Sequence, residues 1–290
     1  MVDDDYQISS EIYSEYNYIC NLKPTLNKHN VVSKFEFTYP QYQVTIDSDG
    51  DLEVPRKHKK TTNIAVIEVA ILSSIESENI KKSTVLGLVG LQIWRGSLLL
   101  ADWLIHNNRH ISSDSYILEL GSGVGLTSII ASMFAPVYCT DVNKGDLLKL
   151  IENNIKRNKH IGKYPLKVVE LDFTAEELPK EVAAVLSKVE IILAADTIYD
   201  DHLTDAFVRT IQKLLFAPSR RTVYVALEKR FVFTIADCDA VAPCYDYFLR
   251  CLGKIKNIEM QEIPLDFPKY FKYDRAKELV LWKLQYCKHS

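Results

Sequence analysis

The sequence predicts an α/β fold, in which helices cover both faces of a mostly parallel sheet. From Val85 onward, short apolar runs alternate with stretches of helical periodicity, and a glycine-rich turn follows the first clear strand. Residues 1–84 differ, because they contain one glycine, Gly50, and favour short strands. We therefore divide the chain into an N-terminal acidic segment with a β extension, residues 1–84, and an α/β domain, residues 85–290.

The N-terminal segment is expected to form an antiparallel β extension. Alternating apolar residues predict a strand from Val31 to Tyr39, and a β-branched run predicts another from Asn63 to Leu72. Two shorter strands, Gln43 to Ile46 and Leu52 to Val54, flank a D-S-D-G turn. The polar stretch from Ser73 to Ser83 is expected to be a linker or loop.

The α/β domain divides into strands that alternate with helices. The expected helices are 97–105, 126–134, 146–158, 175–186, 203–215 and 245–252, and the strands among them are 116–120, 137–140, 166–171, 190–194 and 222–227. Five strands joined by helical crossovers predict a parallel sheet that is buried on both faces. Two last strands, 255–263 and 278–286, predict a terminal hairpin that adds an antiparallel edge strand. Seven strands with this ending are the architecture of the class I, Rossmann-like methyltransferases.

Composition excludes several classes of protein. The 290 residues are 47% apolar and 25% charged, as in an ordinary globular protein, and the net charge of −3 gives no basic field for direct binding of nucleic acid. The six cysteines form no C-x-x-C pair, and His106 and His110 lack a third partner, so we expect neither a disulfide framework nor a metal site. No window approaches the roughly 18 apolar residues of a spanning helix. We expect a protein of the nucleus, the cytoplasm or both, and no membrane partner.

The strongest local signal is the segment YILELGSGVG, residues 116–125. Glu119 stands near the end of the strand, and Gly121, Gly123 and Gly125 follow it. Such glycines permit a positive φ and let backbone N–H groups approach a ligand. A dinucleotide turn needs glycine at position 126, which is a leucine, so the spacing favours S-adenosylmethionine. The alternative is a tight turn whose glycines only relieve packing.

Acidic residues end the next strands. Asp141 ends the second strand, where a carboxylate overhangs the glycine turn and accepts hydrogen bonds from both ribose hydroxyls. Its alternative role is a helix cap. Asp172 follows the third strand, where it could hold an adenine amino group while Phe173 stacks beside the ring. A D-F pair alone is more often a turn.

The fourth strand ends in IILAADTIYDD, which places Asp196 and Tyr199 at the opening of the crevice. Methyl transfer to an amine needs a neutral nucleophile, and a lysine with a pKa of about 10.4 must lose a proton at a cost of roughly 4 kcal/mol. A carboxylate that holds the remaining amine protons and an aromatic ring near the developing cation suit this task. The alternative is an N-cap aspartate with a core tyrosine.

Taken in order, the segments VGLQIWRGSLLLADWL, ELGSGVG, YCTD, LDF and AADTIY resemble methyltransferase family 16, seven-strand enzymes that mostly modify protein lysines. The resemblance covers about residues 85–286. It implies that Trp94 is a wall of the cofactor pocket, that Asp141 is the ribose acid and that Phe173 lies beside the adenine. The resemblance also assigns the methionine and ribose contacts to Glu119, Gly121, Ser122 and Gly123, and the methyl-transfer motif to the residues from Ala195 to Tyr199. Many relatives carry a tryptophan in place of Phe173, which weakens the stacking assignment.

We therefore expect an S-adenosylmethionine-dependent enzyme that methylates a lysine side chain of a protein. The acceptor could be a nucleic-acid-associated or chaperone protein, and we expect a monomer. The alternatives are a methyltransferase that acts on another acceptor and a cofactor-binding adaptor without catalysis. The β extension and its basic run, Arg56 to Lys60, lie outside the predicted cofactor fold. We expect them to affect substrate choice or location and to leave the cofactor affinity intact, although a solvated loop is the simplest reading of the basic run.

Overall fold

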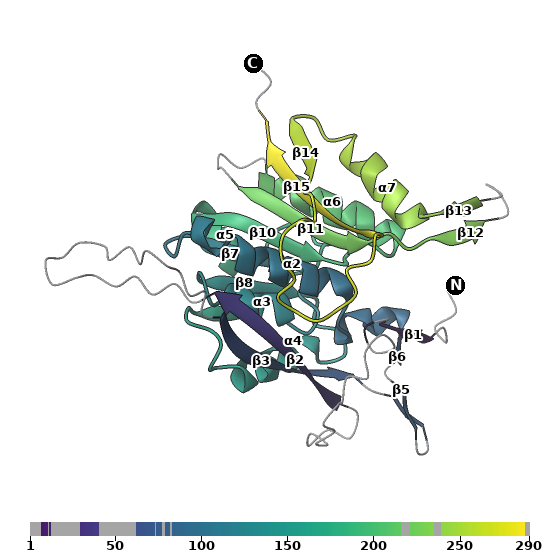
Figure 1. The fold of residues 1–290 in the computed structure, drawn as a ribbon. Coiled ribbons are helices and arrows are strands. Elements are labelled where there is room, and N and C mark those ends of the chain that lie inside the picture. The colour runs from purple at the N-terminus through teal and green to yellow at the C-terminus, as the bar shows by residue number, and fades with distance from the viewer. Residues whose placement is uncertain are drawn as a thin grey trace, which may run out of the picture.

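The computed structural model describes residues 7–10, 12, 30–40, 62–72, 74–76, 79–81, 83–215, 221–234 and 239–287. Its centre is a seven-stranded sheet of order β14-β15-β11-β10-β7-β8-β9 (Figure 1). The parallel strands are β7 (Tyr116–Leu120), β8 (Val137–Asp141), β9 (Leu166–Glu170), β10 (Val189–Ala195) and β11 (Thr222–Glu228). The predicted α/β fold is confirmed.

The last two strands form the predicted terminal hairpin with an antiparallel edge strand, and the structure shows which of the two takes the edge. β15 (Leu279–Tyr286) is antiparallel to both of its neighbours, and it lies between β11 and β14 (Ile258–Glu262) and not at the edge of the sheet. The sequences of the two strands explain this order. β15 reads LVLWKLQY and has four buried residues among its eight, whereas β14 reads IEMQE and has none among its five, so the more polar strand takes the edge.

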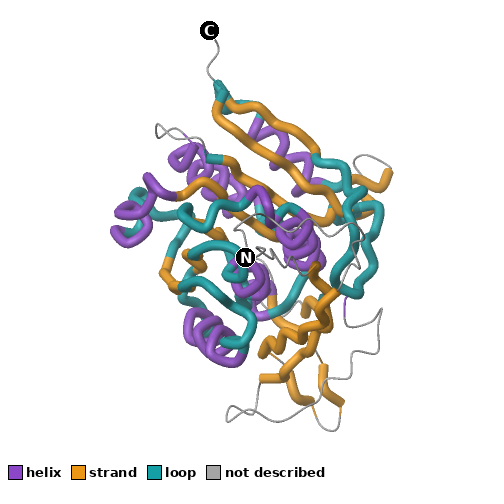
Figure 2. The backbone as a smooth tube through the Cα atoms, turned by 60° about the vertical axis from the view of Figure 1, so that its left-hand side comes forward, coloured by secondary structure: helices purple, strands orange, loops and turns teal. Residues whose placement is uncertain are grey.

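Helices cover the two faces of the sheet, as Figure 2 shows. On one face lie α2 (Arg95–His106), α3 (Leu126–Ala131) and α4 (Leu147–Arg157), and on the other lie α5 (Lys180–Val185), α6 (Asp201–Leu215) and α7 (Pro243–Leu252). Because successive side chains of a strand point to opposite faces of the sheet, each strand contributes to the apolar core on both faces. In β7, Ile117 packs with the first group of helices and Leu118 with the second. α5 begins later than predicted, since Pro179 precedes its first residue, and the 3-10 turn η3 (Leu186–Lys188) extends it.

Several short elements carry no clear signal in the sequence. The stretch predicted as a linker contains the paired strands β4 (Ser74–Glu76) and β5 (Asn79–Lys81), followed by β6 (Ser83–Val85), which pairs with β1 (Gln7–Ser9). Two 3-10 helices, η1 (Leu86–Leu91) and η2 (Asn108–His110), flank α2, and a small hairpin of β12 (Val232–Thr234) and β13 (Asp239–Val241) follows β11. Strands of three residues are too short for a periodic pattern to be read from the sequence.

The N-terminal β extension is a two-stranded ribbon of β2 (Asn30–Pro40) and β3 (Thr62–Leu72), as predicted. Its buried face carries Phe35, Phe37 and Ile67, which belong to the same apolar core as α2, α3 and α4. The boundary at 84/85 therefore separates two segments that pack together. The predicted strands 43–46 and 52–54 and the basic run at 56–60 lie outside the described residues.

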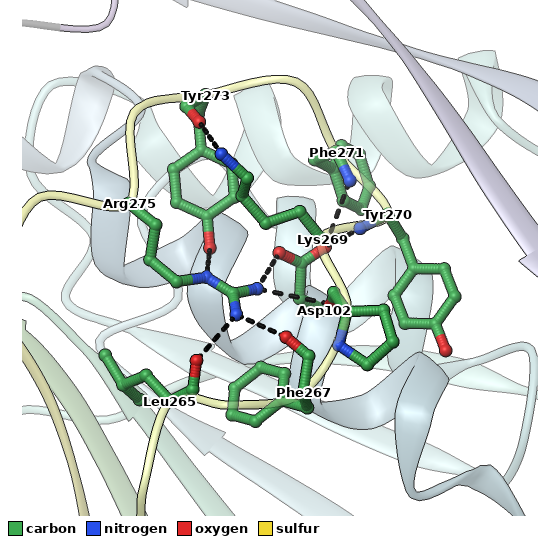
Figure 3. A network of polar contacts seen from close by, with 9 residues as sticks. Asp102, Leu265, Phe267, Lys269, Tyr270, Phe271, Tyr273 and Arg275 are labelled. Carbon is green, nitrogen blue, oxygen red and sulfur yellow. Dashed lines mark hydrogen bonds and ion pairs between the residues drawn. The ribbon is translucent and has the colours of Figure 1, made fainter.

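A buried ion pair fastens the loop 263–278, between β14 and β15, onto α2 (Figure 3). Asp102 is 0% exposed, and its Oδ1 accepts hydrogen bonds from the backbone N–H groups of Tyr270 (2.8 Å) and Phe271 (3.0 Å). Its Oδ2 accepts a hydrogen bond from Arg275 Nη2 at 2.6 Å. The ring of Phe271 stacks on Phe37 with centroids 4.8 Å apart, so this loop also seats the ribbon.

Replacement of Arg275 by methionine keeps an unbranched side chain but leaves the buried Asp102 carboxylate without its cation. We expect the free energy of unfolding to fall by roughly 3 kcal/mol, the scale for breaking a buried ion pair from one side. Lys277→Met is the matched control, because the Lys277 side chain is 91% exposed and should change stability by less than about 0.5 kcal/mol. Denaturant unfolding measures both, and equal midpoints for the two variants would contradict a stabilising role for this pair.

Candidate active site at the carboxyl ends of the parallel strands

A cavity of about 490 Å³ opens where the parallel strands end. Its walls come from the glycine turn after β7, from the residues that follow β8, β9 and β10, and from the segment before α2. All of the predicted site residues line it except Glu119 and Gly125, namely Trp94, Gly121, Ser122, Gly123, Asp141, Asp172, Phe173, Ala195, Asp196 and Tyr199. The sequence prediction thus identified residues from five segments of the chain that meet at this cavity.

The glycine turn follows β7 with three positive φ angles, +63° at Gly121, +54° at Gly123 and +86° at Gly125. Space is restricted as well. A Cβ on Gly121 would lie 2.7 Å from Thr197 Cγ2, and one on Gly123 would lie 3.0 Å from the carbonyl oxygen of Gly90. Glycine is therefore required by both backbone conformation and packing.

Ser122 fixes the turn to the neighbouring strand. Its Oγ donates to the carbonyl oxygen of Thr140 at 3.1 Å and accepts from the backbone N–H of Thr140 at 3.0 Å. The backbone N–H of Ser122 donates to the same carbonyl oxygen at 2.9 Å. The Ser122 hydroxyl thus holds the turn against β8, and Ser122 also lines the cavity.

Glu119 lies beneath the turn and not at the cavity. It is 0% exposed, and its Oε2 accepts a short hydrogen bond from Ser128 Oγ of α3. Burial, together with a smaller effect of the Asp141 carboxylate, raises the pKa of Glu119 to about 7. Successive strand residues point to opposite faces, and Glu119 points to the face that α3 covers. Glu119 does not line the cavity, so its predicted cofactor contact stays a prediction, and Gly125, whose Cβ would lie 3.1 Å from Ile151 Cγ2, also serves packing.

Asp141 ends β8 and faces the turn. Its Oδ2 accepts from the backbone N–H of Gly123 at 2.8 Å, and its Oδ1 accepts from the backbone N–H of Val142 at 2.7 Å. Burial nevertheless raises the pKa of Asp141 to about 6, because desolvation outweighs the two hydrogen bonds. The two hydrogen bonds thus hold the carboxylate in the cavity wall, while burial makes its ionised form less favourable than it is in water.

Asp172 and Phe173 form the wall beyond β9. Asp172 is exposed, and its Oδ1 accepts from the backbone N–H of Thr174 at 2.8 Å and from Thr174 Oγ1 at 2.7 Å. The aspartate therefore builds a local turn, as its alternative interpretation had it. The half-buried ring of Phe173 borders the cavity and lies 5.3 Å from the ring of Phe207.

Asp196 connects three elements at the end of β10. It follows β10 with a left-handed backbone, φ +50°. Its Oδ2 accepts from the backbone N–H of Gly96, in the first turn of α2, at 2.6 Å, and its Oδ1 accepts from the backbone N–H of Glu228 at 3.1 Å. The Glu228 side chain in turn pairs with Arg95 of α2. The first turn of a helix is stabilised by a negative charge, so Asp196, which follows β10, acts as a cap for α2.

Tyr199 stands three residues further along the same wall. Burial and the carboxylates of Asp141 and Asp200 raise the pKa of Tyr199 to about 12, so its hydroxyl stays protonated at neutral pH. Asp200 also lines the cavity, and its Oδ1 accepts from the backbone N–H of Leu203 at the start of α6. This end of the cavity therefore carries two carboxylates and a neutral phenol.

The sequence reasoning missed one continuous wall of the cavity, residues 89–93, which run from η1 toward α2. Trp94 follows this wall, and its Nε1 donates to the carbonyl oxygen of Val89 at 3.0 Å. The Arg230 guanidinium lies 4.8 Å from the centre of the Trp94 ring. A short 3-10 turn has neither helical nor strand periodicity, so only its position before Trp94 could have indicated it.

The Gly96 contact can be tested directly. A Cβ at Gly96 would lie 2.5 Å from Asp196 Oδ2 and 3.0 Å from the carbonyl oxygen of Ala226. Gly96→Ala should therefore displace α2 or Asp196 and reduce the free energy of unfolding by about 1–3 kcal/mol. At Gly253 a Cβ would make an ordinary contact at 3.4 Å, so Gly253→Ala is the control and should not destabilise the protein. Equal unfolding midpoints would remove the constraint inferred at Gly96.

In the part of the chain that the structure describes, no three His, Cys, Asp or Glu side chains gather as metal ligands. The same residues include no helix with the length and apolar character needed to cross a bilayer.

Comparison with known proteins agrees with this geometry. Residues 74–239 match the family model for lysine methyltransferases. Methyltransferase-like protein 22 of Mus musculus is 32% identical over 288 residues, which cover 83% of this chain and 73% of that protein. The protein-lysine N-methyltransferase EEF2KMT of Mus musculus is 29% identical over 231 residues, which cover 74% of this chain and 64% of that protein.

A solved structure of the glycopeptide N-methyltransferase MtfA complexed with sinefungin aligns with 67% of this chain and 87% of its own, at 11% identity and a TM-score of 0.44. The family model alone spans more than half of the chain, and the similarity to methyltransferase-like protein 22 extends over 83% of it. The chain belongs to the lysine methyltransferase family and is an S-adenosylmethionine-dependent methyltransferase of that class.

Proposed function

We propose that this enzyme transfers a methyl group from S-adenosylmethionine to the side-chain amine of a lysine in a protein substrate. The observation that carries the proposal is the wall made by Asp196, Tyr199 and Asp200, in the same cavity as the glycine turn. Carboxylates there attract a cationic amine, and a protonated phenol adds no competing charge. Relatives named as protein-lysine methyltransferases support the same acceptor.

The residues present fit the cofactor in both shape and charge. We assign the ribose to Asp141, the close backbone approach to Gly121 and Gly123, the adenine side to Phe173 and the sulfonium end to the wall near Trp94. When bound, S-adenosylmethionine supplies a methyl group on a positively charged sulfur. Aromatic faces and carboxylates are suited to that charge.

The protein's own residues prepare the acceptor amine. A lysine enters as an ammonium ion, and its neutralisation at pH 7.4 costs roughly 4 kcal/mol. Burial in a cavity with apolar walls favours loss of that proton to solvent. Asp196, held by Gly96 and Glu228, then accepts hydrogen bonds from the remaining N–H groups and directs the nitrogen lone pair into the cavity. Tyr199 contributes its neutral hydroxyl and ring beside the developing charge.

The proposal is tested with methyl-labelled S-adenosylmethionine and a cell lysate, with and without prior protease treatment. We expect label in intact protein bands, recovery of the label as methyl-lysine after hydrolysis, and no labelled protein after proteolysis. Mass spectrometry of the labelled band identifies the acceptor. The control is Gly123→Val, whose side chain would meet the Gly90 carbonyl at the cavity. Label in small molecules after proteolysis would indicate another acceptor, and cofactor binding without any labelling would indicate an adaptor.

The raised pKa of Asp141 predicts a pH dependence of cofactor binding. Ribose hydroxyls donate more strongly to a charged carboxylate than to a neutral one, so binding favours the ionised form. Asp141 becomes protonated as the pH falls through about 6. The dissociation constant for S-adenosylhomocysteine should therefore increase below that pH, approaching roughly tenfold per pH unit, and level off above it.

Calorimetric titration from pH 5 to pH 8 measures this profile. Asp141→Asn should bind more weakly than wild type above about pH 6, approach it at lower pH and lose the inflection near 6, while Glu119 is unchanged in the variant. An unaltered inflection in Asp141→Asn would assign it to another group and remove the ribose assignment.

A further inference from the structure

The outer edge of β3 is covered by asparagine side chains of α4 and not by another strand. Asn154 Oδ1 accepts from the backbone N–H of Ala70 at 2.8 Å, and Asn154 Nδ2 donates to the carbonyl oxygen of Ala70 at 3.1 Å. Four residues later, at the C-cap, Asn158 repeats the same pair with Glu68, at 2.9 Å and 2.7 Å. Each carboxamide therefore takes the place of a strand neighbour, and this edge of the ribbon is satisfied here by two matched side chains.

One of these two asparagines also touches the cofactor turn. Asn154 Nδ2 uses its second hydrogen to donate to the carbonyl oxygen of Val124 at 3.0 Å. Val124 belongs to the glycine turn and lines the cavity. Asn154 is 0% exposed, and its one acceptor bond and two donor bonds leave no ambiguity about which atom is nitrogen. Asn158 makes its other bond to the carbonyl oxygen of Asn154 and not to the turn.

The rest of the buried face of α4 continues this connection. Leu147 lines the cavity, and Ile151 Cγ2 lies 3.1 Å from the position of a Cβ on Gly125. With Asn154 these residues lie at positions i, i+4 and i+7, so they share one side of the helix. This stripe of α4 joins the cavity, the glycine turn and the N-terminal ribbon, which lies beside α4 in Figure 1.

We propose that Asn154 is a positioning residue of the cofactor site, through which the N-terminal ribbon supports the glycine turn. Docking of the ribbon and binding of the cofactor are then coupled, and linkage makes the coupling reciprocal. The ribbon thus acts on the binding site through Asn154, since none of its described residues lines the cavity. This replaces the expectation that the extension leaves cofactor affinity intact. The proposal rests on the cofactor and not on the identity of the acceptor.

Asn154→Ala and Asn158→Ala form a matched pair for the test. Both variants remove an asparagine from the ribbon edge and leave the backbone groups of one β3 residue unpaired, so both should lower the melting temperature by similar amounts. Only Asn154→Ala also frees the Val124 carbonyl. We expect its dissociation constant for S-adenosylhomocysteine to rise roughly three- to tenfold, the effect of one neutral hydrogen bond, while that of Asn158→Ala stays within about twofold of wild type.

Hydrogen exchange on the unmodified protein tests the reciprocal effect and does not depend on the folding of any variant. S-adenosylhomocysteine should slow exchange of the Ala70 and Glu68 amides of the ribbon. In Asn154→Ala, where the Glu68 bond to Asn158 is retained, the ligand should no longer slow exchange at Glu68. Wild-type cofactor affinity in Asn154→Ala, an equal loss in both variants, or ribbon amides of the wild type that do not respond to the ligand would each overturn the proposal.

Discussion

The carboxylate of Asp196, which lines the cavity, joins three elements of the fold, β10, α2 and β11. It follows β10, accepts a hydrogen bond from the first turn of α2 and accepts another from the end of β11. A left-handed backbone at a non-glycine residue costs about 1–2 kcal/mol, and hydrogen bonds to a charged group, worth roughly 1.5–3 kcal/mol each, offset that cost. Gly96 is needed because any larger residue would occupy the position of the carboxylate. The charge of the site is therefore placed by the fold before any ligand binds.

Asp141 is the second carboxylate of the cavity that backbone N–H groups hold in place. Asp141 also accepts two backbone N–H groups, but burial raises its pKa to about 6, so its charge depends on pH. Glu119 lies deeper, and its pKa of about 7 reflects complete burial. The acids near the glycine turn thus differ in depth, and only Asp141 faces the cavity. Asn154 of α4 donates a further hydrogen bond to the same turn, at the carbonyl oxygen of Val124. The turn is therefore bonded to β8 through Asp141 and to α4 through Asn154, and Asn154 connects it to the ribbon.

Much of the fold could be predicted because parallel strands buried on both faces read as short apolar runs. Asp141 and Asp196 could be located for the same reason, since each follows such a run and the carboxyl ends of parallel strands share one edge. The interior position of β15 could not be predicted, because a run of apolar residues does not specify its neighbours. Wall 89–93 lacks periodicity, and Asn154 reads as an ordinary polar residue in a helix until the ribbon is seen against it.

The role of Asp196 in the chemical step is the central claim, and single-turnover rates at saturating cofactor test it most directly. The acceptor is the lysine protein identified by labelling, and the variants are Asp196→Asn and Asp196→Ala, each checked for folding and for affinity toward S-adenosylhomocysteine. Asn keeps one carbonyl acceptor and loses the charge, whereas Ala loses both, so we predict a slower rate for Asn and a still slower one for Ala, with cofactor affinity retained. A folded Asp196→Ala enzyme that binds cofactor normally and methylates at the wild-type rate would contradict the account and leave Asp196 as a cap for α2.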